Sequence, residues 1–303
     1  MTFNHNSLPI IARLPFRFSR SASHIPIKTL EFACIVRKTK VKCQVNIQLV
    51  CKMNATRDST RLVFTLAISA VFAALTCIAT LVFTAYVPTT TGYFNIGETV
   101  IYIGALVFGP YVGAFAGGVG AAIADMLVAF VFFPGTLVIK AGEGAIVGFL
   151  NKRLRNTSRF NWRILTAALG VVVGGALAVT GSNYYTGEVQ LFLGFPSPQN
   201  PTFTLFVPIV AWYFLGAIVA LLIILLGSRI DPESGRAVFS MICGGLEMVV
   251  GYFLYETLIL GQTTAALEIP INIGQMTIGL VVALPVARII QRTLPQLKSW
   301  TNA

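Results

Sequence analysis

The chain has 303 residues, of which 55% are hydrophobic and 11% charged, and its formal net charge is +11 at pH 7. Soluble globular proteins carry about 25% charged residues, so this chain has too few to cover a water-exposed surface and its composition indicates a membrane protein. Residues 1–52 hold nine Lys or Arg and one acidic residue, so most of the excess charge belongs to this tail and not to a folded basic face for nucleic acid.

The basic tail, residues 1–52, allows two interpretations. It contains Arg and Ser, has almost no acidic residues, and resembles a targeting presequence in composition. Alternatively, the true start is Met53, which directly precedes the charged lead-in to the first apolar run. In either case we expect the tail to be disordered or absent from the mature protein, and we assign residues 53–303 to a membrane domain.

Cysteine and histidine are placed where they offer little for metal or haem binding. The five cysteines form no CxxC pair, and both histidines lie in the tail. The apolar body therefore lacks the usual ligand sets of zinc and haem sites. We expect no metal, no cofactor and no disulfide scaffold.

Apolar runs long enough to cross a bilayer follow the tail. A spanning helix needs about 20 apolar residues, and the second run is long enough for two short spans with a turn near Gly109 and Pro110. The sequence therefore predicts an all-α, polytopic helical bundle with about eight transmembrane helices. The runs are residues 62–86, 96–133, 136–150, 163–184, 204–227, 237–259 and 270–290.

The loops between these runs alternate in charge. Lys and Arg precede the first span and follow the fourth, sixth and eighth, with five of them in residues 151–163. Because Lys and Arg favour the cytoplasmic side, the alternation predicts a plasma-membrane protein with both termini in the cytoplasm. The loops on the opposite side contain no Lys or Arg and comprise residues 87–95, 129–135, 185–203 and 260–269.

Two predicted spans carry small residues at helical spacing. Gly113, Gly117 and Ala121 are each four residues apart in the third span, and Ala70 and Ala74 have the same spacing in the first. Such faces let helix backbones approach closely in lipid, so internal helix packing is the default interpretation for both.

Polar side chains from five separate segments are predicted to lie at one depth, in the outer third of the membrane. Charged groups inside a membrane are costly and are therefore candidate functional residues. Their convergence predicts a cavity open to the outside, and Glu247 is expected to lie deeper. The candidates are Asn95, Glu98, Lys140, Glu143, Tyr252, Tyr255, Glu256, Asn272 and Gln275.

Several of these residues also have structural interpretations. Lys140 and Glu143 are three residues apart and could pair to lower each other's burial cost. Asp125, which shares this depth, is expected to hydrogen-bond a neighbour rather than a ligand. Asn272 and Gln275 are better ligand contacts because their amides form directional hydrogen bonds, and Tyr252 and Tyr255 could stack on a flat ring.

Several segments resemble the substrate-binding (S) components of energy-coupling factor (ECF) transporters, and most closely the riboflavin-transporter-like branch. The resemblance covers about residues 60–155 and 237–292, in the same order as in that family. It is carried by GYFNIGE (92–98), LVFGPYVG (106–113), ADML (124–127), PGTLVIKAGEG (134–144), GYFLYE (251–256) and EIPINIGQ (268–275).

The chain departs from this family in its number of spans. The family has six, so the resemblance implies a six-span core, residues 62–159 and 237–292, with a helical hairpin inserted within residues 160–236. Two inserted spans would preserve the orientation of the last two core spans.

The resemblance implies a binding subunit and not an enzyme. Such a subunit captures a vitamin or related micronutrient, with riboflavin as the first candidate, in an outward cavity capped by residues 87–95. It then docks on a transmembrane coupling subunit driven by two ATPase subunits, which must be separate chains because no Walker motif occurs here. Ala70 and Ala74 match the Ala-xxx-Ala face with which the family contacts the coupling subunit.

Two other function classes stay open at this stage. A stand-alone secondary transporter could use Glu143 or Glu256 as a proton site, although no inverted repeat supports it. An intramembrane enzyme is disfavoured because the body has no histidine and no nucleophile paired with a base. A purely structural scaffold would leave the cluster of polar residues unexplained.

Overall fold

The computed structural model describes residues 33–37, 40–44, 47–87, 90, 92–154, 159–194, 198–228 and 232–294. The chain divides into two compact units, Met1–Val63 and Phe64–Ala303. In the first unit, β1 (Ala33–Arg37) pairs antiparallel with β2 (Lys40–Gln44). Residues 1–32 of the predicted tail lie outside the described residues, so its disorder stays a prediction.

The second unit is a helical bundle with a small sheet. Among the described residues, seven helical stretches are long and apolar enough to cross a membrane. The helices are α1 (Ile47–Val82), α2 (Gly97–Phe108), α3 (Pro110–Phe115), the π-helical η1 (Ala116–Ala121), α4 (Ala122–Val128), α5 (Phe133–Arg153), α6 (Arg159–Tyr184), α7 (Ile209–Ser228), α8 (Pro232–Ile259) and α9 (Gln262–Thr293). Together they confirm the predicted polytopic all-α membrane fold.

The second predicted span is a short helix. At 1.5 Å per residue, the 12 residues of α2 extend about 18 Å, which is less than the roughly 30 Å hydrocarbon core. Gly109, with φ of 96°, ends α2, and Pro110 occupies the first turn of α3. The turn predicted there is confirmed, since a left-handed glycine ends a helix and proline is favoured at the start of the next.

The glycine face of the third predicted span packs against α5. A Cβ added at Gly113 would lie 2.6 Å from the carbonyl oxygen of Gly144, and one at Gly117 would overlap the carbonyl of Lys140. The predicted role in helix packing is confirmed for both glycines. Because this contact brings backbone against backbone, it also fixes where α5 presents Lys140.

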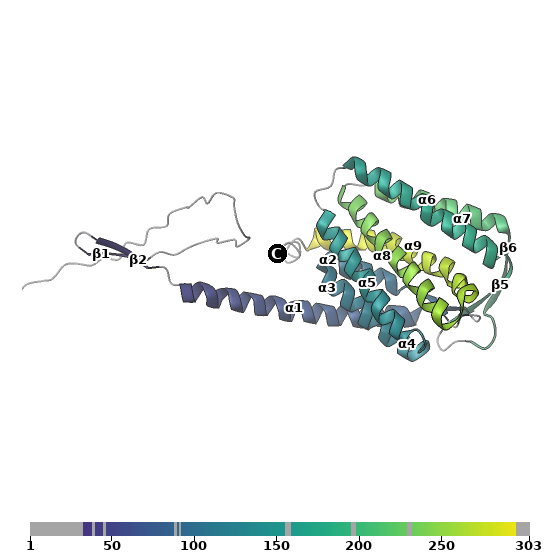
Figure 1. The fold of residues 1–303 in the computed structure, drawn as a ribbon, viewed down its shortest axis with the longest axis horizontal. Helices are drawn as coiled ribbons and strands as arrows, with labels where there is room; N and C mark the ends of the chain where they lie inside the picture. Colours follow the sequence, from purple (N-terminus) through teal and green to yellow (C-terminus); the bar gives the residue numbers. More distant parts are fainter. Residues whose placement is uncertain are drawn as a thin grey trace, which may run out of the picture. The chain divides into compact units, whose positions relative to one another are not determined.

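Helices α6 and α7 lie side by side as a hairpin (Figure 1). Helix α5 packs directly on α8, with Ile139 against Gly251 and Val147 against Gly244. The helices that flank the hairpin in sequence thus contact each other without it. This arrangement is compatible with the predicted insertion, which stays a prediction.

Four short strands form a small sheet at the ends of helices and in the loops that the sequence predicts to be irregular. They are β3 (Thr84–Val87), β4 (Gly92–Asn95), β5 (Gly187–Leu193) and β6 (Phe203–Val207), in the order β4-β3-β5-β6. We call β3, β4 and the residues between them the cap hairpin. Its β3 pairs with β5 of the α6–α7 hairpin, with Tyr86 opposite Phe192.

Three predicted boundaries are therefore wrong. The first span ends at Val82 and not at residue 86, and the span predicted from residue 204 begins at Ile209 because β6 precedes it. Residues 260–269, predicted as a loop, mostly belong to α9, which begins at Gln262. The start of α9 could not be predicted because Glu268 is polar and Pro270 normally breaks a helix.

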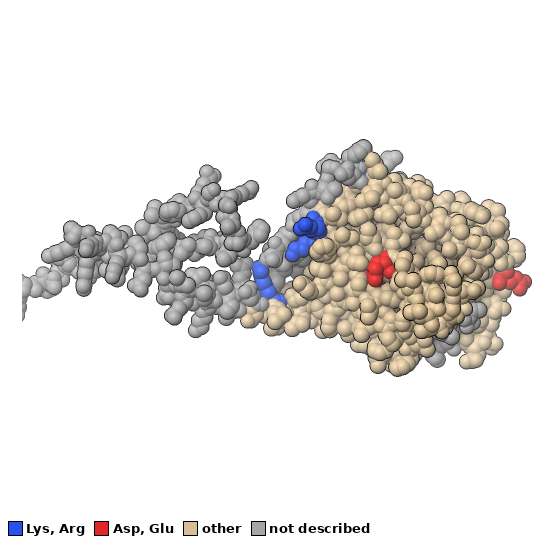
Figure 2. All heavy atoms as spheres, viewed as in Figure 1, with Lys and Arg blue, Asp and Glu red and all other residues tan. Residues whose placement is uncertain are grey.

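The surface of the second unit suits a lipid environment. Figure 2 shows that most of the described surface in that view carries neither acidic nor basic side chains. Large apolar side chains are exposed instead, as in Val138, which is 71% exposed. Such an extensive apolar surface indicates contact with lipid, because soluble monomers expose only small apolar patches.

The two ends of the bundle differ in chemistry. We call the end that carries β3 to β6 the strand end, and the opposite one the basic end. Basic residues gather where α5 and α9 end and α8 begins. Parts of the predicted basic loops, residues 155–158, 229–231 and 295–303, lie outside the described residues. The described basic residues at this end include Lys152, Arg153, Arg236, Arg288 and Arg292.

Candidate substrate-binding site

A pocket lined mainly by polar side chains lies at the strand end. Six of the nine predicted ligand contacts line it, so the predicted convergence of polar side chains is found in the structure. We call it the strand-end pocket. Its lining residues are Gly92, Tyr93, Asn95, Asp125, Phe132, Lys140, Tyr252, Glu256, Glu268, Asn272 and Gln275.

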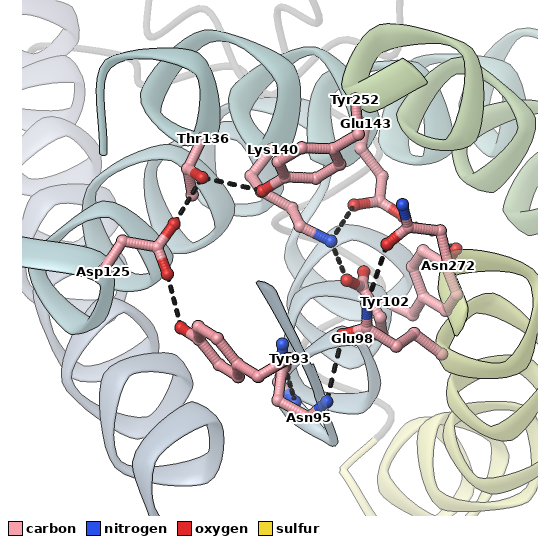
Figure 3. A network of polar contacts seen from close by, with 12 residues as sticks. Tyr93, Asn95, Glu98, Tyr102, Asp125, Thr136, Lys140, Glu143, Tyr252 and Asn272 are labelled. Carbon is pink, nitrogen blue, oxygen red and sulfur yellow. Dashed lines mark hydrogen bonds and ion pairs between the residues drawn. The ribbon is translucent and has the colours of Figure 1, made fainter. Parts of the chain in front are cut away.

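Helix α5 provides the only basic residue among the described residues that line the pocket. Thr136, Lys140 and Glu143 are spaced four and three residues apart, so they share one face of α5. The Lys140 ammonium bonds to Glu98 of α2 and lies 3.3 Å from Glu143 (Figure 3). Lys140 Nζ also lies 5.5 Å from the centroid of the Tyr252 ring, within the range of a cation–π contact.

Glu98 and Glu143 lie behind the pocket wall rather than on it. Their exposed fractions are 1% and 0%, and neither residue lines the pocket. Tyr102 OH donates to Glu143 Oε1 at 2.8 Å. The pairing of Lys140 with Glu143 is thus observed, and Glu98 joins it as a second counter-ion. Burial of one ammonium between two carboxylates leaves negative charge in excess.

Asp125 of α4 accepts hydrogen bonds from two hydroxyl groups. One comes from Tyr93 of β4 and the other from Thr136 of α5. Thr136 Oγ1 lies 2.8 Å from Tyr252 OH, and because the threonine proton is directed at Asp125, Tyr252 is the donor of this bond. The expectation that Asp125 bonds to neighbours is confirmed, yet Asp125 also lines the pocket, which the sequence analysis did not predict.

Tyr93 is a dependable proton donor at the cap hairpin. Burial, with the nearby Asp125 carboxylate as a second cause, raises the pKa of Tyr93 well above its usual value. A raised pKa keeps the phenol protonated at every physiological pH. The hydrogen bond from Tyr93 to Asp125 ties β4 to α4.

One face of α9 forms the opposite wall. Glu268, Asn272 and Gln275 are four and three residues apart and so lie on the same side of the helix. Gln275 Nε2 donates to Asn272 Oδ1 at 2.9 Å, which orients both amides. The two amides, predicted as ligand contacts, thus bond to each other within one turn, and their contact with a ligand stays a prediction.

The cap hairpin is bonded to this face of α9. The backbone amide of Asn95 donates to Gln275 Oε1 at 3.2 Å, and the hydroxyl of Thr90 donates to Glu268. The side chain of Asn95 accepts from the amide of Gly97, the first residue of α2, at 2.9 Å. The cap hairpin is therefore closed over the pocket by contacts to both α4 and α9.

Helix α8 contributes Tyr252 and Glu256, which are four residues apart and both line the pocket. Glu256 is 2% exposed, and its Oε2 has no hydrogen-bond partner among the described residues. Tyr255, also predicted to contact ligand, donates instead to the Val131 carbonyl at 2.8 Å and does not line the pocket. Glu247 lies deeper, beside Gly142 of α5.

Four further pocket residues were not predicted, for different reasons. Gly92 and Tyr93 belong to the cap hairpin, whose strands the sequence does not reveal. Phe132 precedes α5 in a segment that reads as plain apolar sequence. Glu268 falls in the range predicted as a loop, although its spacing of four residues from Asn272 was a usable signal.

The predicted docking residues lie on α1. Ala70 and Ala74 are exposed on α1, whereas the neighbouring Ala73 is buried. Their side chains are therefore available to lipid or to a partner helix. Within the described residues, no group of three or more His, Cys, Asp or Glu is arranged to hold a metal ion.

Comparison with known proteins gives a family assignment. A family model described as "ECF-type riboflavin transporter, S component" matches residues 61–226, which is more than half of the chain. A Pyrococcus woesei protein described as an "uncharacterized protein in gap 3'region" is 43% identical over 95 residues, or 31% of this chain and 60% of that protein. The chain thus spans less than two thirds of this relative.

No solved structure matches the chain significantly. The family match includes α6 and most of α7 and ends before α8 begins. It agrees with the apolar helices and with the motifs of residues 92–144. The chain belongs to the family of ECF-type riboflavin transporter S components.

Proposed function

We propose that this chain is the substrate-capturing membrane subunit of an ECF-type ABC importer for a vitamin or related micronutrient. The observation that carries the proposal is the strand-end pocket, where polar side chains of four helical segments meet under a closed cap hairpin. Riboflavin is the first ligand to test because the matching family is described by it. A ligand with rings, amides or hydroxyl groups suits the mixture of aromatic and polar lining residues.

The cap hairpin is the part of the pocket that must open for a ligand to enter. Among its described residues, Thr90, Tyr93 and Asn95 form hydrogen bonds to the pocket walls. Breaking them exposes Asp125, Glu268 and Gln275 to a ligand without unpacking a helix. Ligand groups would then replace the cap's hydrogen bonds.

The partners in this proposal are a transmembrane coupling subunit and two ATPase subunits. Ala70 and Ala74 are the proposed docking face on α1 because they are exposed and small, so that a partner helix can approach closely. ATP hydrolysis would take place on the ATPase subunits. The basic end would face the cytoplasm of the cell, which puts both termini inside and opens the strand-end pocket outward.

A stand-alone, proton-coupled secondary transporter is the alternative. The buried carboxylates Glu143 and Glu256 favour it, because intramembrane acidic groups commonly carry protons in such transporters. Uptake into vesicles that contain only this chain separates the two. The importer proposal predicts no accumulation driven by a pH gradient, and proton-driven accumulation would favour the alternative.

Removal of the two amides on α9 tests the pocket directly. Each amide loses its ligand hydrogen bonds in the double variant Asn272→Ala, Gln275→Ala, and each bond is worth about 1 kcal/mol. We therefore expect vitamin affinity to fall at least about tenfold in equilibrium titrations of the detergent-purified protein. Gln262→Ala, exposed in the first turn of α9, is the control and keeps the original affinity. Unchanged affinity in the double variant would show that the ligand binds elsewhere.

A further inference from the structure

The strand-end pocket is strongly acidic. Three carboxylates line it, Asp125, Glu256 and Glu268, against the single ammonium of Lys140. That ammonium is already bonded to Glu98 and lies beside Glu143, both behind the wall. The pocket and its supporting residues therefore contain five carboxylates for one basic side chain.

These carboxylates differ in how well the protein satisfies them. Asp125 accepts from two hydroxyl groups, and Glu268 accepts from Thr90. Glu256 is 2% exposed, lines the pocket, and has an Oε2 atom without a hydrogen-bond partner among the described residues. An unpaired charge is costly to bury, and because Glu256 lines the pocket, a positively charged group that enters the pocket can pair with this carboxylate.

Glu256 and Glu268 lie on either side of the short connection between α8 and α9. Helix α8 ends at Ile259 and α9 begins at Gln262, so the two glutamates lie in the last turn of one helix and the second turn of the next. Both face the pocket, and like charges in a site of low dielectric repel each other. A positively charged group between them would satisfy Glu256 and remove this repulsion.

The rest of the lining favours an organic cation over a metal ion. Among the described residues, no three His, Cys, Asp or Glu side chains converge as metal ligands. The rings of Phe132 and Tyr93 line the same pocket, and aromatic faces attract organic cations. Carboxylates beside aromatic rings are the combination that recognises protonated amines and alkylated ring nitrogens.

We propose that the strand-end pocket is selective for a ligand that carries a positively charged organic group, with Glu256 as its counter-ion and Glu268 as second acceptor. This inference rests on the proposed capture function and narrows its substrate class. It ranks cationic ring compounds above neutral flavins, and neutral flavins above anionic vitamins, which the acidic walls would repel.

This ranking can be tested by titrating the full-length protein in detergent with three probes that differ in charge. Thiamine carries a cationic thiazolium ring, riboflavin is neutral and pantothenate is anionic. We expect thiamine to bind at least about tenfold more tightly than riboflavin, and pantothenate not to bind. A tenfold difference corresponds to about 1.4 kcal/mol, which is modest for one buried charge contact.

Glu256→Gln removes the charge and keeps the shape of the side chain. It should weaken thiamine binding at least about tenfold and riboflavin binding by a smaller factor, because a neutral ligand loses no charge contact. Glu268→Gln is the second variant, with a smaller loss expected because Thr90 already bonds to Glu268. Glu188→Gln, exposed on β5 at the same end of the bundle, is the matched control and should bind as the original protein does.

Two results would overturn the inference, and they differ in what they say about the capture function. If riboflavin binds as tightly as thiamine, or if Glu256→Gln leaves thiamine affinity unchanged, the selectivity is wrong while vitamin capture stands. If the folded protein binds none of the three probes nor any other vitamin of a panel, both the selectivity and the capture function fail.

Discussion

Lys140 is the residue on which the polar network depends. Its ammonium bonds to Glu98 and Glu143, and all three side chains are buried. Removing one member of a buried ion pair typically costs about 3–5 kcal/mol, because the remaining charge stays buried without a partner. For a bundle of this size, Lys140→Met should therefore lower the melting temperature by roughly 6 to 20 °C.

Thermal unfolding of the purified protein in detergent measures this effect. Lys152→Met, which removes an exposed ammonium from the end of the same helix, is the control and should leave the melting temperature unchanged. Equal stability of Lys140→Met and the control would mean that Glu98 and Glu143 are not ionised in the folded protein.

The hydroxyl group of Tyr93 is predicted to hold the cap hairpin closed. Tyr93→Phe removes the donor to Asp125 and leaves the ring in place. Because a hydrogen bond to a charged group is worth about 1.5–3 kcal/mol, bound vitamin should dissociate roughly ten to a hundred times faster. Stopped-flow displacement measures the rate, and Tyr111→Phe, exposed on α3, is the control. Dissociation at the original rate would exclude Tyr93 from closing the pocket.

Individual pocket residues could be predicted where helical spacing and depth decide their position. Lys140, Asn272 and Gln275 were found in this way, since each shares a helix face with another polar residue. Spacing alone could not tell which of Tyr252 and Tyr255 faces the pocket, because residues three apart occupy neighbouring rows of one helix. Predicted depth in the membrane likewise could not distinguish Glu98, which pairs with Lys140 behind the pocket wall, from the residues that line the pocket.

At the scale of the elements, the glycine contacts between the third span and α5 are predicted to stabilise the bundle. Gly117→Ala would drive a methyl group into the Lys140 carbonyl, whereas a Cβ at Gly175 of α6 meets nothing within 4 Å. Overpacking costs about 1–3 kcal/mol, so Gly117→Ala should melt at a lower temperature. Gly175→Ala should melt at the same or a slightly higher temperature, because alanine favours a helix over glycine.

The same two variants give a second measurement. Displacement of the Lys140 backbone moves a pocket residue, so Gly117→Ala should also weaken vitamin binding, and Gly175→Ala should not. Equal stability and binding of the two variants would contradict the close packing of η1 on α5.

Helices could be predicted from apolar runs, whereas the strands could not. Strands β3 to β6 have four to seven residues and lie next to spanning helices, so their apolar residues merge with the neighbouring runs. Pairing of β3 with β5 also depends on two segments about a hundred residues apart, which no local pattern reveals. The π-helical turn η1 was likewise hidden inside a run that reads as ordinary helix.

At the scale of the whole molecule, the α1 face with Ala70 and Ala74 is predicted to recruit the coupling subunit. Ala70→Trp places a large side chain where a partner helix must approach, so copurification of the coupling subunit should fall at least about fivefold. Val138→Trp, which adds bulk to the exposed face of α5, is the control and should keep it. Vitamin binding should survive in both variants. Undiminished copurification with Ala70→Trp would exclude this docking face.

The order of the helices and the convergence of polar residues at one end followed from the sequence because both depend on hydropathy and loop charge. The closed cap and its link to the α6–α7 hairpin did not, since they arise from hydrogen bonds between distant segments. The family match agrees with the transport function that the motifs predicted.

The central claim is that this chain by itself captures a single vitamin molecule in the strand-end pocket. The most direct test is to purify the full-length protein in detergent and to identify any copurifying small molecule by absorbance and mass spectrometry. We predict one vitamin molecule per chain, lost in the Asn272→Ala, Gln275→Ala variant. A preparation of folded protein that contains no such ligand, and that binds none from a panel of vitamins, would contradict the claim.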